Sequence, residues 1–555
     1  MRERSHRLHT RAALIGAALL LAALPADPQS KAVSTIPHLE KRGDTTQLIV
    51  DGKPFLALAG ELYNNSATSL EYMQAVWPRL AAMRLNTVLA AVSWAMLEPS
   101  EGRFDYSLVD GLIREARAHN LRLVLLWFGS WKNTWSSYAP DWVKRDFERF
   151  PRVQLRNGSG TERLTPLSPA NREADARAFA ALMRRIREVD GNFHTVILIQ
   201  VENEAGVIPD ARDYSAPANT AYSQDVPREL MDYLQKHKDM LHPYLRAKWT
   251  AAGFKASGSW ETVFGSGLET DDLFMAWQYA RYIGRVAEAG KAEYALPMYV
   301  NAALIRPNFV PGQYNSGGPL AHSIDIWRAG GPQLDFFAPD IYFEFKNWCA
   351  QYDRPDNPLF IPEAAGGRAG AANVFYAVGQ HKSFGFSPFG IDGGDSSSGG
   401  TDALARSYDI LSQLAPLILE NQPKGRVAGV LLEELTPAQK LRLGGYTLNV
   451  SPARRPVPAA VSPEASQSPA PHGIFIATGP DEFYMAGGGL TVTFSPDTAG
   501  PPIAGLATVE EGRFVDGQWL RGRTLAGDDT GQGNSISLDA GREPGILHVT
   551  LYRYR

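Results

Sequence analysis

Eight short apolar runs, alternating with segments of helical periodicity between residues 45 and 420, constrain the fold most strongly. The runs are rich in Val, Ile, Leu and Phe with little polar alternation, as is typical of buried parallel strands. Between them, segments such as Asp105–Asn120 and Ala174–Asp190 gather apolar side chains on one helical face. A strand followed by a helix, repeated eight times, predicts an α/β protein with a (β/α)8 TIM barrel. A doubly wound open sheet is the alternative. The expected strands are 55–59, 87–92, 121–128, 195–201, 297–304, 336–342, 359–362 and 384–390.

The spacing of the apolar runs and a change in the sequence pattern near residue 425 predict the domain organisation. We expect the catalytic barrel to span 31–424, with an insertion near 206–295 that forms a wall of the cleft or packs beside it. The insertion contains helical segments at Arg228–Lys248 and Leu273–Ala289. From 425 to 555, short strands and frequent Gly and Asp turns predict a smaller β-sandwich-like domain, with a Pro-rich loop near 451–472.

The N-terminal segment 1–30 has the features of a signal peptide. Four arginines precede the apolar segment Ala12–Leu24, which is short for a membrane span, and Pro25-Ala26 offers a cleavage site. A membrane anchor is the alternative. We expect an exported protein, periplasmic or secreted, that is not bound to a membrane after the signal is removed. The single cysteine, Cys349, has no recognisable His partner and is expected to be a buried thiol rather than a nucleophile.

The composition argues against several other classes of function. A net charge of −4 gives no support to a nucleic-acid partner. The 11 histidines show no metal-binding spacing, so we expect no metal. The sequence has neither a Gly-x-Ser-x-Gly nucleophile elbow nor a phosphate-binding Gly-x-x-x-x-Gly-Lys loop, and no cofactor is expected.

Two of the expected strands end in glutamates. The fourth runs into Glu202-Asn203-Glu204, and the seventh runs into Glu363. The carboxyl ends of all barrel strands meet at one mouth, so the carboxylates of these strands can converge across it. Glycoside hydrolysis needs two such groups, about 5 Å apart for retention of anomeric configuration or about 6.5–9.5 Å apart for inversion. Strand alternation alone does not separate Glu202 from Glu204 as the first of these groups.

The motifs around these glutamates resemble those of known glycosidases. Asn203-Glu204 together with Glu363 resembles the signature of the clan of retaining barrel glycosidases. The segment 200–206 and the segment 86–105, with Trp94 and Glu98-Pro99, are similar to motifs of family 35 β-galactosidases, and this resemblance covers about 45–420. The C-terminal part resembles the β-domain that follows the barrel in one subgroup of these enzymes.

The resemblance implies a role for each matching residue. Glu204 would be the general acid/base, with a pKa raised by a second carboxylate. Glu363 would be the nucleophile, and Tyr342 would donate a hydrogen bond to it. Asn203 would bind the 2-hydroxyl of the sugar.

Two loops depart from the usual pattern of the family. After the third strand, Lys132 and Asn133 stand where most members have a sugar-binding Glu, and we expect them to contact the sugar instead. After the first strand, Glu61 is either a further carboxylate of the mouth or an ion-pair partner. The same departures resemble the subgroup that removes β-galactosyl side chains from xyloglucan. The aromatic residues Trp94, Trp131, Trp135 and Trp142 suit a branched polysaccharide fragment, and a structural place in the core is the alternative for each.

These observations predict a carbohydrate partner and an exported, retaining exo-β-galactosidase. Its substrates are expected to be plant cell-wall oligosaccharides such as xyloglucan. The same fold cutting another β-glycoside or an α-arabinoside is a second hypothesis, because the rim of the mouth decides which sugar is read. A non-catalytic glycan-binding barrel is the third.

Overall fold

The computed structural model describes residues 36–393, 400–433, 438–453, 469–538 and 545–555. The predicted signal peptide at 1–30 and most of the predicted Pro-rich loop lie outside these residues. Within the described residues, no helix is both long enough and apolar enough to cross a membrane.

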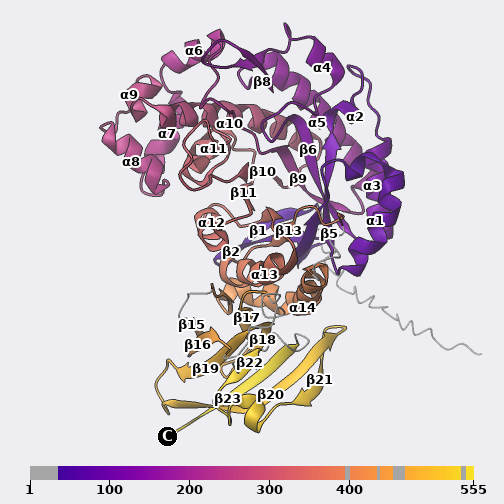
Figure 1. Cartoon of the computed structure of the whole chain (residues 1–555), viewed down its shortest axis with the longest axis vertical. Coiled ribbons are helices and arrows are strands. Elements are labelled where there is room, and N and C mark those ends of the chain that lie inside the picture. The colour runs from indigo at the N-terminus through magenta and orange to yellow at the C-terminus, as the bar shows by residue number, and fades with distance from the viewer. Residues whose placement is uncertain (1–35, 394–399, 434–437, 454–468, 539–544) are drawn as a thin grey trace, which may run out of the picture. The chain divides into compact units, whose positions relative to one another are not determined.

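A closed barrel of eight parallel strands forms the larger part of the structure, which confirms the predicted TIM barrel (Figure 1). Each of the eight apolar runs supplies one strand, and the strands follow one another around the barrel in chain order. They are β4 (Ala57–Glu61), β5 (Thr87–Ser93), β6 (Arg122–Lys132), β9 (Val196–Asn203), β10 (Met298–Ala303), β11 (Phe336–Ile341), β12 (Ile361–Ala364) and β13 (Gly385–Pro388).

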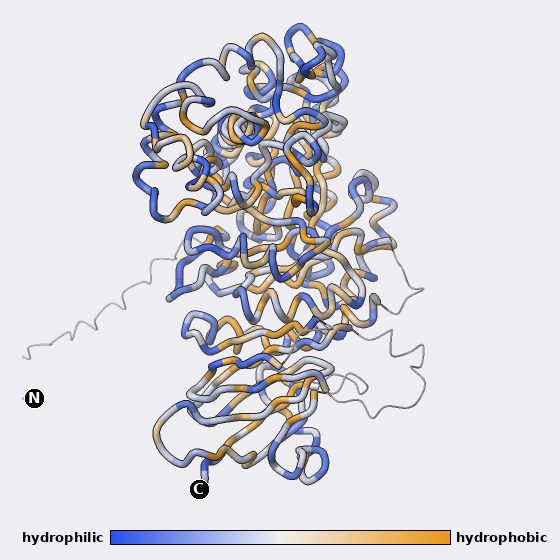
Figure 2. Tube along the Cα trace, turned by 60° about the vertical axis from the view of Figure 1, so that its left-hand side comes forward, coloured by the Kyte–Doolittle hydropathy of each residue, from blue (hydrophilic) through white to orange (hydrophobic). Residues whose placement is uncertain are grey.

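Helices follow the strands and cover the outside of the barrel. They are α1 (Leu70–Ala82), α2 (Trp94–Leu97), α3 (Ser107–Ala118), α4 (Asp141–Arg145), α5 (Pro169–Asp190), α11 (Ile324–Gly330), α12 (Phe345–Tyr352), α13 (Gly367–His381) and α14 (Gly400–Asn421). Hydrophobic residues run through the inner segments, and hydrophilic residues are prominent on the outer loops (Figure 2). Cys349 is buried in α12, and burial raises the pKa of its thiol, which favours the protonated, unreactive form.

Aromatic rings fill part of the barrel interior. Tyr299 stacks on Phe336 with ring centroids 5.0 Å apart, and Phe336 meets Phe384 at 5.3 Å. Phe360 stacks on Phe384, also at 5.3 Å. The interior is therefore a packed core rather than a pore, as in other barrels of this kind. Polar groups that act on a substrate must consequently lie above these rings, at the strand ends.

The insertion between β9 and β10 is helical, as predicted. It contains α6 (Ala216–Ser223), α7 (Arg228–Lys236), α8 (Pro243–Ala251), α9 (Trp260–Phe264) and α10 (Leu268–Glu293). The segment expected as one helix over Arg228–Lys248 is two helices, because Pro243 starts α8 and the His242 side chain accepts a hydrogen bond from the Tyr244 N–H as its N-cap.

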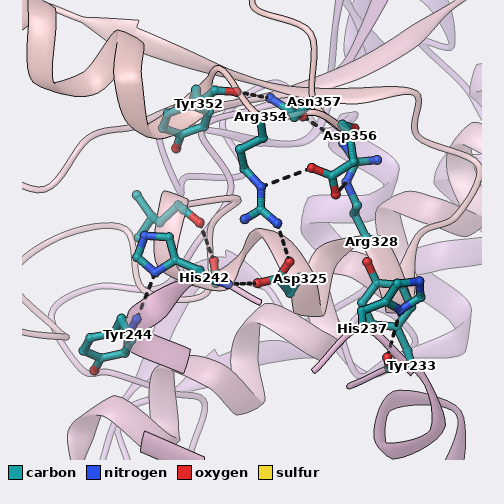
Figure 3. Close-up of polar contacts among 12 residues, drawn as sticks. Tyr233, His237, His242, Tyr244, Asp325, Arg328, Tyr352, Arg354, Asp356 and Asn357 are labelled. Carbon is teal, nitrogen blue, oxygen red and sulfur yellow. Dashed lines mark hydrogen bonds and ion pairs between the residues drawn. The ribbon is translucent and has the colours of Figure 1, made fainter. Parts of the chain in front are cut away.

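A hydrogen bond to a buried carboxylate attaches the insertion to barrel helix α11 (Figure 3). The Asp325 carboxylate of α11 accepts a hydrogen bond of 2.7 Å from the backbone N–H of His242, which precedes α8. Arg354, in the loop before β12, donates to the other oxygen of Asp325 at 2.7 Å. The buried Asp325 is thus held from both sides, and these insertion residues pack beside the barrel at α11.

Two antiparallel sheets follow the barrel, as expected for the C-terminal region. Apolar residues of both sheets, such as Val430 and Phe475 of one and Leu448 and Val492 of the other, share one core. The six-stranded sheet contains, in spatial order, β14 (Val427–Leu431), β17 (His472–Ala477), β18 (Glu482–Gly488), β23 (Ile546–Tyr554), β20 (Ile503–Val515) and β21 (Gln518–Thr524). The four-stranded sheet contains β15 (Gln439–Leu443), β16 (Tyr446–Pro452), β19 (Leu490–Pro496) and β22 (Ile536–Leu538).

Smaller elements complete the structure. A three-stranded antiparallel sheet precedes the barrel, and a hairpin lies between β6 and β9. These elements are β1 (His38–Arg42), β2 (Thr45–Val50), β3 (Lys53–Phe55), β7 (Arg152–Gln154) and β8 (Gly160–Leu164), with 3-10 turns η1 (Ser66–Thr68), η2 (Ala321–Ser323), η4 (Gln422–Lys424) and η6 (Gly527–Thr530).

Candidate active site

Three carboxyl groups meet where β9, β11 and β12 end. Glu204 follows β9, Asp340 lies near the end of β11, and Glu363 lies on β12 directly beside Asp340 in the sheet register. One oxygen from each of the three lies within 4.8 Å of the others. This spacing is also close enough for the three groups to share a cation, so the expectation of no metal stays a prediction.

Glu363 accepts hydrogen bonds from two residues that the sequence predicts for the site. The Tyr342 hydroxyl donates to Oε2 at 2.8 Å, and the Asn203 amide donates to Oε1 at 3.4 Å. The ammonium group of Lys132 in turn donates to the side-chain oxygen Oδ1 of Asn203 at 2.9 Å, which fixes the side-chain amide with its N–H groups toward Glu363. The predicted residues Asn203, Lys132 and Tyr342 are therefore all gathered around Glu363, which holds its carboxyl in a fixed position.

Glu204 is held through its backbone in an uncommon conformation. Its φ is +45°, in the left-handed region that non-glycine residues rarely adopt. The Glu204 N–H donates to the Asn301 side-chain oxygen at 2.9 Å, and the Asn315 amide donates to the Glu204 carbonyl oxygen, also at 2.9 Å. Two amides from the chain after the insertion thus fix the residue that the sequence predicts as the acid/base.

The Glu204 carboxyl has a pKa raised to about 7. Burial is the main cause, since only 8% of the residue is exposed, and the nearby charge of Glu363 raises the pKa further. The Lys132 ammonium acts in the opposite direction. Glu204 therefore retains a proton near neutral pH, which a general acid requires. The sequence anticipates the influence of the second carboxylate but not the larger effect of burial.

Asp340 is a member of the site that the sequence reasoning missed. It is 2% exposed, accepts a hydrogen bond of 2.8 Å from the Asn301 amide and shares a hydrogen bond with the Glu204 carboxyl. Burial, and then the charges of Glu363 and Glu204, raise its pKa well above the usual range of an Asp. Asp340 lies near the end of β11, two residues before Tyr342. The expectation that polar residues at strand ends reach the mouth, which selected the glutamates, therefore also applies to Asp340.

Glu61, at the end of β4, is a further carboxyl of the mouth. It is 1% exposed, and neither of its carboxylate oxygens has a hydrogen-bond partner among the described residues. Burial and the charge of Glu363 raise its pKa, while the charge of Lys132 lowers it. The described contacts thus include no ion pair of Glu61, and its oxygens are available to a bound group.

Glu202 points away from the mouth. Its carboxyl accepts hydrogen bonds from the backbone N–H groups of Ser130 and Trp131, at 3.1 and 2.7 Å. It is fully buried beside Asp175, and burial together with the Asp175 charge raises its pKa. Glu202 therefore supports the end of β6, whereas Glu204 faces Glu363.

The tryptophans named as sugar contacts divide by burial. Trp94 and Trp131 have no exposed surface, so in this structure neither offers a ring face to a ligand. The Trp94 ring N–H donates to Glu98 at 2.8 Å, and Trp131 packs edge-on against Tyr279 and Tyr282 of α10. Neighbouring side chains therefore cover both rings, and a role for either ring as a sugar contact stays a prediction.

Asn133 lies at the mouth, where the sequence placed it. The residue is exposed, and its φ of +49° belongs to the turn that ends β6. Its backbone N–H donates to the Asn203 carbonyl oxygen at 3.2 Å. The side chain of Asn133 is therefore free to approach a ligand, but its role remains a prediction.

Comparison with known proteins supports a glycosidase. Residues 63–266, which include β5 to β9 and Glu204, match a family model described as beta-galactosidase, of glycosyl hydrolase family 42. Residues 404–537 match a model described as a domain of unknown function, DUF5597. A beta-galactosidase of Xanthomonas manihotis is 29% identical over 213 residues, which are 38% of this chain and 32% of that protein. The chain thus matches about a third of the length of this relative.

Solved structures with a similar outline include three further beta-galactosidases. That of Bacillus circulans sp. alkalophilus aligns over 66% of this chain and 57% of its own, with 13% identity and a TM-score of 0.44. That of Rahnella sp. R3 aligns over the same shares with 17% identity and a TM-score of 0.44. The enzyme of Halorubrum lacusprofundi aligns over 64% of this chain and 58% of its own, with 17% identity and a TM-score of 0.45.

The family match bears on the resemblance drawn from the motifs. The matching model is that of family 42, which is a different family from family 35, and membership of family 35 stays a prediction. The family 42 model and the Xanthomonas relative are in line with the coarser expectation of a glycoside hydrolase, and that activity stays a proposal. Residues 63–266 are therefore similar to the β-galactosidase domain of glycosyl hydrolase family 42.

Proposed function

We propose that this protein is an exported, retaining exo-β-galactosidase that uses Glu363 as nucleophile and Glu204 as general acid/base. The observation that carries the proposal is the approach of the two carboxyl groups, whose nearest oxygens lie within 4.8 Å. A gap of about 5 Å suits direct attack by a carboxylate, whereas inverting enzymes need about 6.5–9.5 Å to admit a water molecule.

The proposed reaction has two steps. In the first, a Glu363 oxygen attacks the anomeric carbon while Glu204 gives its proton to the glycosidic oxygen, so the bond to the leaving group breaks and a galactosyl ester forms. In the second, Glu204 takes a proton from water, the water oxygen attacks the anomeric carbon, and the ester bond to Glu363 breaks. Each group ends in its starting state, and the product keeps the anomeric configuration of the substrate.

Neighbouring residues support these steps. The Asn203 amide, oriented by Lys132, lies beside Glu363 and suits a hydrogen bond to the 2-hydroxyl, which strengthens in the transition state. The unpartnered oxygens of Glu61 suit other sugar hydroxyls, since a buried acceptor without a partner costs free energy. These contacts favour a galactoside-binding role for both residues.

The finer parts of the proposal rest on the sequence. Segment 1–30 supports export, and the motif at 200–206 supports kinship with family 35. The departures at Glu61 and Lys132 support xyloglucan oligosaccharides as substrates. Hydrolysis of aryl β-galactoside, β-glucoside and α-arabinoside, compared side by side, tests the choice of sugar, and the β-galactoside should be preferred.

Replacing the nucleophile tests the mechanism. Glu363→Ala should abolish turnover of an aryl β-galactoside. Added azide should restore turnover with α-galactosyl azide as product, because azide occupies the space of the lost carboxylate and attacks the anomeric carbon in a single displacement, which inverts its configuration. Glu71→Ala, on the exposed side of α1, is the matched control and should keep full activity. A fully active Glu363→Ala enzyme would refute the proposed mechanism.

A further inference from the structure

Trp135 differs from the other tryptophans near the end of β6 in being open to solvent. It is 47% exposed, whereas Trp94 and Trp131 are fully buried. An exposed indole costs hydrophobic free energy, since large aromatic side chains gain most from burial. The exposure therefore calls for an explanation in terms of a ligand or a partner.

A tight turn fixes Trp135 relative to the site. The Lys132 N–H donates to the Trp135 carbonyl oxygen at 2.8 Å, and the Trp135 N–H donates to the Lys132 carbonyl oxygen at 3.0 Å. The two residues between them, Asn133 and Thr134, have φ of +49° and +71°, as in the two-residue turns that connect hairpin strands. Trp135 is thus held directly opposite Lys132, whose ammonium group contacts Asn203.

A buried arginine holds one face of the Trp135 ring. The Arg163 guanidinium carbon lies 3.9 Å from the ring centroid, a cation–π contact, and the Arg163 side chain also donates to the Thr134 hydroxyl at 3.2 Å. Arg163 is only 4% exposed and comes from β8, outside the turn. The indole is therefore fixed from one side, and its exposed surface belongs to the opposite face and the edge.

The turn lies beside the end of β9, next to the residue proposed as the acid/base. Lys132 pairs with Asn203 in the sheet register, and the Asn133 N–H donates to the Asn203 carbonyl oxygen at 3.2 Å. Glu204, which would protonate the glycosidic oxygen, is the next residue in the chain. The glycosidic oxygen joins the galactosyl ring to the leaving group. An aromatic side chain next to the acid/base therefore lies where the leaving group would bind.

We propose that Trp135 is a stacking platform for the first sugar ring of the leaving group, and so a determinant of substrate preference. A pyranose ring presents C–H groups on its faces, and the fixed flat indole covers such a face without the loss of side-chain freedom. The preferred substrate class is therefore a β-galactoside with a sugar leaving group. This inference rests on the proposed β-galactosidase function.

Two substrates separate this role from a structural one. A galactosylated xyloglucan oligosaccharide has a sugar leaving group, whereas β-galactosyl fluoride has none. Trp135→Ala should lower kcat/KM for the oligosaccharide about tenfold, mainly through KM, and change kcat/KM for the fluoride less than about twofold. Trp135→Phe should restore most of the oligosaccharide activity. Tyr72→Ala, which removes an equally exposed aromatic ring from α1, is the control and should change neither.

The outcomes are distinguishable. Equal losses on both substrates would assign Trp135 a purely structural role and overturn the inference, as would unchanged activity of Trp135→Ala on the oligosaccharide. Failure of the unaltered protein to hydrolyse either substrate would instead refute the proposed β-galactosidase function.

Discussion

At the scale of single residues, the environments of Glu204 and Glu363 differ in the way that their proposed roles require. Glu363 accepts hydrogen bonds from a phenol hydroxyl and an amide N–H, which hold its carboxyl in place. Burial and the charge of Glu363 instead favour the protonated form of Glu204. One group can therefore attack while the other donates a proton at the same pH.

The raised pKa of Glu204 predicts the pH dependence of the first chemical step. The protonated form is present below about pH 7 and is lost as the pH rises through that value, so kcat/KM should fall on the alkaline side with an apparent pKa of about 7. Initial rates on a β-galactoside with a sugar leaving group measure this limb. Fluoride leaves with little acid assistance, so kcat/KM for β-galactosyl fluoride should fall less on the alkaline side. An alkaline limb identical for both substrates would argue against Glu204 as the acid.

Replacing Asp340 should move the same limb. Asp340 shares a hydrogen bond with Glu204 that lowers the pKa of Glu204, so Asp340→Ala should raise that pKa and shift the alkaline limb to higher pH. Asp340→Asn retains an N–H donor and should shift the limb less. pH profiles of kcat/KM for the two variants provide the measurement, and a profile of Asp340→Ala that matches the unaltered protein would contradict this role.

The sequence predicts some of these residues and not others for a physical reason. Glu204 and Glu363 stand out because a charged residue at the end of an apolar strand has to leave the core. Trp94, Trp131 and Trp135 all suited a sugar contact in the sequence, and only the packing of Tyr279 and Tyr282 from α10 shows that Trp131 is covered. Burial of an aromatic ring depends on distant segments, which periodicity does not reveal.

At the scale of elements, the end of β6 and the turn after it depend on a buried carboxyl pair. Glu202 accepts hydrogen bonds from the backbone N–H groups of Ser130 and Trp131, and Asp175 of α5 accepts a hydrogen bond of 2.6 Å from the Ser130 hydroxyl. These contacts set the position of Lys132 and hence of Asn203. The strand boundaries were predictable from the apolar runs, but this support was not, because the sequence does not show which distant groups pair with Asp175, a carboxylate on the buried face of α5.

A substitution at Gly129 tests how tightly the end of β6 is packed. A Cβ at residue 129 would lie 2.3 Å from the Trp127 ring nitrogen and 2.5 Å from a Glu202 oxygen, so Gly129→Ala should destabilise the protein by about 1–3 kcal/mol. Urea unfolding gives the change in free energy. Gly160→Ala, at a site with no atom within 4 Å of the new methyl group, is the control and should be close to neutral. Equal stability of the two variants would contradict the packing described here.

At the scale of the whole described structure, the barrel and the C-terminal sheets meet through close backbone contact. A Cβ at Gly429 of β14 would lie 2.7 Å from the backbone nitrogen of Gln380 and 2.8 Å from the carbonyl oxygen of Phe375, both in α13. Sequence patterns predicted the barrel, the insertion and the sheets separately. They gave no sign of this contact, because it depends on two glycines, Gly379 and Gly429, that carry no hydrophobic pattern.

Gly429→Ala should therefore weaken the joint between the two regions. Because backbone atoms on α13 cannot move aside as a side-chain end can, we expect a loss of about 2 kcal/mol and a lower thermal midpoint by calorimetry. Gly160→Ala again serves as the control. A midpoint for Gly429→Ala equal to that of the control would show that the contact contributes little to stability.

The stereochemistry of the first product tests the central claim, double displacement by Glu204 and Glu363, most directly. Proton NMR during hydrolysis of a β-galactoside distinguishes the two anomers of galactose before they interconvert. With carboxylate oxygens within 4.8 Å of each other, double displacement predicts that β-galactose forms first and the α-anomer appears only later by mutarotation. Initial release of α-galactose would contradict it.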